Sequence, residues 1–102
     1  MSTDRELLEA AAKAAGNGAQ WDCPERGMMV LAPSGLDTMT WNPLTDDGDA
    51  FRLAVKLGLR IDTPKHKGFG SSCGNQTVFR DDPFEQTRLA IVRAAAALGA
   101  SK

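Results

Sequence analysis

The segment from Lys65 to Ser72 combines basic, glycine and hydroxyl residues, a combination suited to binding an anion. Glycines let backbone N–H groups approach an anion closely, while cationic side chains neutralise phosphate and hydroxyls donate hydrogen bonds to it. The order of the residues is neither that of a P-loop nor that of a dinucleotide-binding fingerprint. The alternative interpretation is a solvated loop. The residues that we expect to bind a ligand here are Lys65, His66, Lys67, Gly68, Gly70, Ser71 and Ser72.

A second candidate binding site combines Trp41 and Asn42 with Arg88. An indole ring can stack on a ligand ring, and the asparagine amide can read the polar edge of that ring. Arg88 is expected near the start of the last helix, beside Asp49. The alternative is structural: Trp41 packs in the core, Asn42 bonds local backbone, Pro43 fixes the turn, and Arg88 forms an ion pair.

Catalytic and metal-binding residues are sparse. His66 is the one side chain with a near-neutral pKa, and Cys73, seven residues later, offers a Cys/His pair without an evident third group to orient it. One histidine and two cysteines fall short of a zinc ligand set. The aspartates at 46, 47 and 49 lack calcium-loop spacing and instead complement a helix dipole. We therefore expect a protein that is not an enzyme, with no metal and no cofactor.

Charge and cysteine usage restrict the partners and the compartment. With 12 basic and 13 acidic residues the net charge is −1, which argues against duplex DNA as a partner. No apolar run approaches the ~18 residues of a membrane span, and the polar start of the chain does not resemble a secretory signal. A cytoplasmic location is expected, in which Cys23 and Cys73, fifty residues apart, stay reduced and unpaired.

The elements that would position these residues fit one α+β domain over residues 1–102. Capping residues and apolar periodicity predict three helices, and alternating or bounded apolar runs predict four strands. The expected order is α-β-β-α-β-β-α, with one small antiparallel sheet packed against the three helices. A long loop is expected over 64–75. The helices are predicted over 3–15, 46–57 and 83–98, and the strands over 28–32, 38–41, 59–63 and 76–80.

The string Trp41-Asn42-Pro43-Leu44-Thr45-Asp46-Asp47-Gly48-Asp49-Ala50 and the amphipathic helix after it form a familiar pattern. This pattern resembles a group of small phage and prophage accessory proteins of unassigned function, and more distantly the phage NinX-like proteins. The helix predicted over 3–15 and the segment 87–96 are similar to the opening and closing helices of the same group. The resemblance implies a phage origin and an accessory role, and it implies no chemistry.

These observations lead to two expected functions that act by binding. The first is a counter-defence protein that sequesters a small, nucleotide-like, anionic immune signal in the cytoplasm of an infected bacterium, as a homo-oligomer with pockets between subunits. The alternative is a protein–protein inhibitor of a host defence complex, in the manner of an anti-CRISPR protein. A small nucleotide hydrolase ranks third, because no catalytic constellation supports it.

Overall fold

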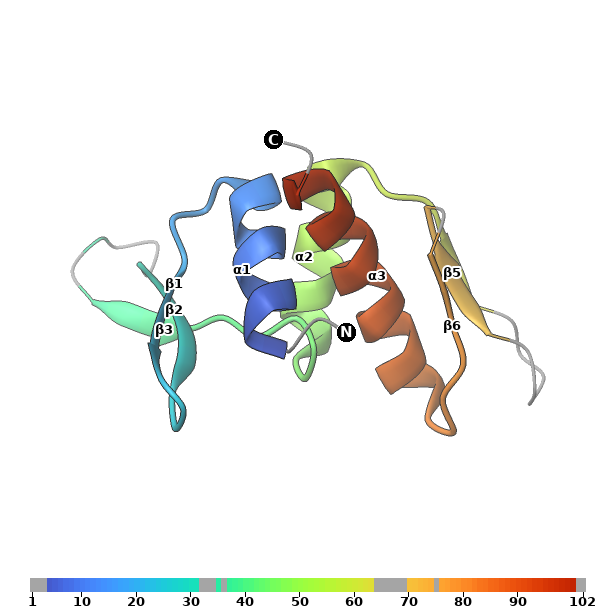
Figure 1. The fold of residues 1–102 in the computed structure, drawn as a ribbon, viewed down its shortest axis with the longest axis horizontal. Helices are drawn as coiled ribbons and strands as arrows, with labels where there is room; N and C mark the ends of the chain where they lie inside the picture. The colour runs from blue at the N-terminus through green and yellow to red at the C-terminus, as the bar shows by residue number, and fades with distance from the viewer. Residues whose placement is uncertain (1–3, 32–34, 36, 64–69, 75, 101–102) are drawn as a thin grey trace.

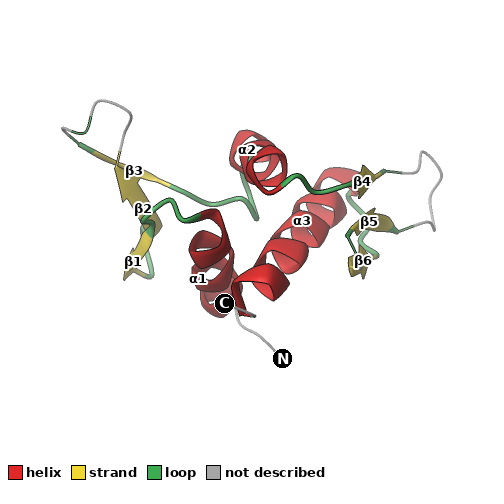
Figure 2. Ribbon diagram, turned by 90° about the horizontal axis from the view of Figure 1, so that it is seen from above, coloured by secondary structure: helices red, strands yellow, loops and turns green. Residues whose placement is uncertain are grey.

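Three helices form a central layer between two small sheets (Figures 1 and 2). The computed structural model describes residues 4–31, 35, 37–63, 70–74 and 76–100. The helices are α1 (Asp4–Ala15), α2 (Asp47–Leu57) and α3 (Pro83–Ala100). Within this described part of the chain, no helix combines the length and apolarity needed to cross a membrane.

Each sheet is an antiparallel meander of three strands. The first sheet contains β1 (Gln20–Cys23), β2 (Gly27–Leu31) and β3 (Thr38–Thr40). The second contains β4 (Ile61–Asp62), β5 (Ser71–Cys73) and β6 (Gln76–Val78). The two sheets lie at opposite ends of the helical layer (Figure 1), and the second packs against α3 through β5 and β6.

The α+β class is confirmed, whereas the expected single sheet is wrong, because the strands form two sheets separated by the helices. Strand β1, which is not among the predicted strands, alternates polar and apolar residues over only four positions, and it pairs with β2 across a tight turn that ends at Gly27, where φ is +70°. Strand β5 falls inside the predicted 64–75 loop. Its Ser-Ser-Cys sequence lacks the usual strand formers, and its pairing with both β4 and β6 makes it a strand.

Helix α2 is capped at its two ends by the residues that the sequence predicts. The Asp46 side chain accepts a hydrogen bond from the backbone N–H of Asp49 at 2.8 Å, which satisfies a donor that the first helical turn leaves unpaired. Gly58 follows the helix with φ +64°, in the left-handed conformation that glycine adopts without steric cost.

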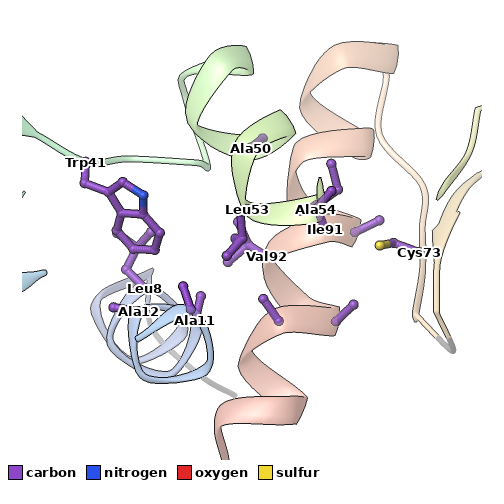
Figure 3. Close-up of a cluster of buried hydrophobic side chains, with 14 of the residues drawn as sticks. Leu8, Ala11, Ala12, Trp41, Ala50, Leu53, Ala54, Cys73, Ile91 and Val92 are labelled. Carbon is purple, nitrogen blue, oxygen red and sulfur yellow. The ribbon is translucent and has the colours of Figure 1, made fainter. Parts of the chain in front are cut away.

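The core lies between the three helices and the inner faces of the sheets (Figure 3). It is rich in alanine, which lets α1 and α3 pack closely. The larger side chains fill the space around this contact, and the Trp41 ring points at α1. The most deeply buried members are Ala11, Met28, Cys73, Val78, Ala90, Val92 and Ala95.

Both cysteines carry unpaired thiols, which confirms the prediction. Cys23 is half-buried in β1, and Cys73 is fully buried in β5 of the other sheet. Burial removes solvent from the Cys73 thiolate and so raises the pKa of that thiol above its ordinary value. In the structure Cys73 therefore belongs to the core, and its burial disfavours a nucleophilic role.

The two thiols are expected to react at very different rates with iodoacetamide in the folded protein at pH 8. The raised pKa lowers the thiolate fraction of Cys73 at any given pH, and burial blocks the reagent. Mass spectrometry of native protein should show one fast modification, at Cys23, which a Cys23→Ser variant lacks. In denaturant both thiols should react. Fast labelling of Cys73 in the folded protein would contradict this expectation.

Candidate functional site

The predicted anion-binding segment is only partly described. Lys65, His66, Lys67 and Gly68 lie outside the described residues. At Gly70, a Cβ would lie 2.7 Å from the Val78 carbonyl oxygen, so glycine is needed for close packing against the end of β6.

The two serines of the same segment lie in β5 and bond within the protein. The hydroxyls of Ser71 and Thr87 lie 2.7 Å apart. Because the Thr87 hydroxyl donates to the Pro83 carbonyl oxygen at 2.8 Å, Ser71 is the donor to Thr87. Ser71 is 1% exposed and ties β5 to α3. The Ser72 hydroxyl faces that of Thr77 across the strand pair at 3.2 Å.

Trp41 and Asn42 shape the connection into α2. Trp41 is 7% exposed and packs in the core, and its backbone N–H donates to the Met28 carbonyl oxygen at 2.9 Å. The Asn42 side-chain oxygen accepts from the Leu44 N–H at 3.0 Å, and the Asn42 N–H donates to the Asp49 carboxylate at 2.9 Å. The geometry of both residues matches the structural interpretation of this string.

Arg88 of α3 reaches the start of α2. Its Nε donates to the Leu44 carbonyl oxygen at 2.8 Å, and its Nη1 donates to the Asp47 carboxylate at 2.5 Å. Its ion-pair partner is thus Asp47 rather than the expected Asp49, which pairs with Arg52 at 2.7 Å. The structure brings Arg88 and Asn42 to the same connection, since Leu44 contacts both of them.

A cleft of about 510 Å³ opens beside this ion pair, between α2, β4 and the start of α3. Its volume falls in the range of about 300–1,000 Å³ that is typical of small-molecule sites. Two phenylalanine rings, one from each helix, line it and remain 65% (Phe51) and 64% (Phe84) exposed. Its apolar lining is Ala50, Phe51, Ile61, Pro83, Phe84 and Ile91, and its polar lining is Asp47, Thr63, Thr87 and Arg88.

Two of these lining residues carry the aromatic surface, and neither was predicted as a site residue. Phe84 lies in the first turn of α3, and its side chain is exposed. Phe51 lies outside the buried stripe of α2, and helical spacing alone turns it toward solvent.

Another groove, of about 490 Å³, lies between α1 and β1. Its aromatic residue, Trp21, is already covered by the Arg5 guanidinium, 5.0 Å from the ring centre. We therefore favour the cleft at Phe51 and Phe84 as the candidate site. Among the described residues, no group of three histidine, cysteine, aspartate or glutamate side chains has a geometry suited to a metal ion.

Compared with protein-family models, with curated proteins and with solved structures, the chain shows no match. The resemblance to phage accessory proteins therefore stays a prediction from the sequence.

Proposed function

We propose that this chain acts by binding a small, ring-bearing molecule in the cleft between α2, α3 and β4. The nucleotide-like signal that a phage accessory protein would sequester belongs to this class. The observation that carries the proposal is the pair of exposed rings, Phe51 and Phe84, at a cleft of suitable size. When a flat ligand stacks on an exposed aromatic ring, the contact stabilises the complex by about 1–3 kcal/mol for each stacked base.

The walls of the cleft are held by the fold before any ligand arrives. Phe51 lies on α2 and Phe84 lies on α3, and these two helices pack against each other. Arg88 fixes the two helices to each other at one end of the cleft through Leu44 and Asp47. A site built on rigid helices needs little ordering when it binds, which favours affinity.

The polar end of the cleft contains one cation and one anion, Arg88 and Asp47, so their charges balance. Such an end suits a hydrogen-bonding edge better than a phosphate. The phosphate of a nucleotide-like ligand is the group for which the sequence predicts Lys65 and Lys67.

Removing both cleft rings, in a Phe51→Ala/Phe84→Ala variant, is expected to abolish retention of the ligand. Two lost stacking contacts of about 1–3 kcal/mol each weaken binding on the order of 100-fold. The protein is purified under native conditions and denatured, and the released small molecules are identified by mass spectrometry. The wild type should release a nucleotide-like molecule, and the double variant should release none.

Phe79→Ala is the matched control, because Phe79 is 61% exposed and does not line the cleft. It should retain the ligand as well as the wild type does, with thermal melting as the check on folding for all variants. Equal retention by the control and the double variant, or no small molecule from the wild type, would contradict the proposal. A co-purified host defence protein in place of a small molecule would support the inhibitor alternative.

A further inference from the structure

We propose that Asp47 determines specificity in this cleft by accepting hydrogen bonds from the donor groups of the bound molecule. The donors in question are N–H or O–H groups close to the stacked ring, such as a base amino group or a ribose hydroxyl. The inference rests on the proposed function, because it assigns the chemistry of the ligand at the same cleft.

Asp47 combines an anchored carboxylate with access from solvent. One of its oxygens, Oδ1, accepts the hydrogen bond from Nη1 of Arg88. The Arg88 side chain is only 16% exposed, whereas that of Asp47 is 65% exposed. A carboxylate has about four acceptor sites, so Asp47 can accept further hydrogen bonds while Arg88 holds it in place.

The neighbouring aspartates serve α2 and the turn before it. Asp46 caps the helix by accepting from the Asp49 N–H and does not line the cleft. Asp49 is buried, and its carboxylate is bonded to the Asn42 N–H and to Arg52. Of the three aspartates at the start of α2, Asp47 is the one that lines the cleft.

The negative charge of Asp47 also determines how the ligand is oriented. A phosphate at Asp47 would face like-charge repulsion, which is strong at the short range of direct contact. A donor-bearing edge would instead make a charge-assisted hydrogen bond, which is roughly twice as strong as a neutral one. The ring and sugar of a nucleotide therefore face Asp47, and its phosphate faces away.

The test measures binding of adenosine 5′-monophosphate by calorimetry to the wild type, Asp47→Asn and Asp46→Asn. Asp47→Asn keeps the size of the side chain and removes its charge, and we expect binding about tenfold weaker or more. Asp46→Asn removes the same charge one residue away. It should bind within about twofold of the wild type, because asparagine caps helices as well as aspartate does.

Two altered ligands distinguish the sources of the donor. Purine riboside 5′-monophosphate carries hydrogen in place of the 6-amino group and so lacks the base donor, and 2′-deoxyadenosine 5′-monophosphate lacks one ribose hydroxyl. The ligand that lacks the relevant donor should bind the wild type and Asp47→Asn equally. Circular dichroism checks the fold, and Asp47→Ser provides a second variant should Asp47→Asn fail to fold.

Equal affinity of the wild type and Asp47→Asn for adenosine 5′-monophosphate would overturn this inference and leave the proposed function standing. Equal weakening in Asp46→Asn and Asp47→Asn would also overturn it, because it would show a general effect of charge at the start of α2. Binding of none of the three nucleotides by the wild type would overturn the inference together with the proposed function.

Discussion

Replacing Trp41 with alanine is expected to lower the melting temperature by about 15 °C or more. Trp41 is 7% exposed, and its indole lies against α1 in the core (Figure 3). Truncating a buried tryptophan costs about 3–5 kcal/mol, because apolar burial is lost and a cavity remains. Thermal melting followed by circular dichroism measures the effect.

Trp21→Ala is the matched control, because it removes the same side chain from a half-exposed site. Its ring is covered on one face by Arg5, at 5.0 Å, and an exposed contact of that kind contributes only about 0.5–1 kcal/mol. A decrease of a few degrees is expected, and Trp41→Phe should fall between the two alanine variants. Small and equal decreases for Trp41→Ala and Trp21→Ala would show that Trp41 is not a core residue.

The helices were predictable because their signals are local. Asp46 and Gly58 mark the two ends of α2, and both take the cap geometry that their residue types favour. Pro83 likewise begins α3 at its predicted position. The exception is the end of the last helix, which is predicted at residue 98, whereas Gly99 lies inside α3 and is buried against α1.

The sheets were less predictable because their pairing depends on contacts distant in the sequence. β4 pairs with β5, which lies within the segment that was expected to be a loop, and this pairing organises the second sheet. Nothing in the periodicity of a strand two or three residues long, such as β4 or β5, indicates which sheet it joins. The separation of the strands into two sheets follows from the position of the helices between them.

Of the residues that line the candidate site, the sequence singles out Arg88 alone, and it indicates neither the other polar residues nor the aromatic ones. Arg88 was singled out, and it lines the cleft at its charged end. Phe51 was overlooked, although the stripe formed by Ala50, Leu53 and Ala54 leaves it on the opposite face of α2. A large aromatic residue on the exposed face of an amphipathic helix is the signal that could have identified this wall of the cleft.

Gly99→Ala is expected to destabilise the protein by about 2–3 kcal/mol, although alanine favours a helix by about 1 kcal/mol over glycine. A Cβ at this position would overlap the carbonyl oxygen of Ala10 and lie 2.8 Å from its carbonyl carbon. Both atoms belong to the backbone of α1, so they cannot rotate away as a side chain would. The two helices would have to separate, or the last turn of α3 would have to detach, and either change breaks the alanine-rich contact.

Gly48→Ala provides the control that separates this clash from the general effect of adding a methyl group to a helix. Gly48 also lies in a helix, but the nearest atom to its Cβ would be Nη1 of Arg52, 3.2 Å away at the end of a flexible side chain. Its melting temperature should stay level or rise, while that of Gly99→Ala falls by about 10 °C. Chemical denaturation at equilibrium should give the same order of stability. A Gly99→Ala protein as stable as the wild type would mean that α1 and α3 do not make this close contact in solution.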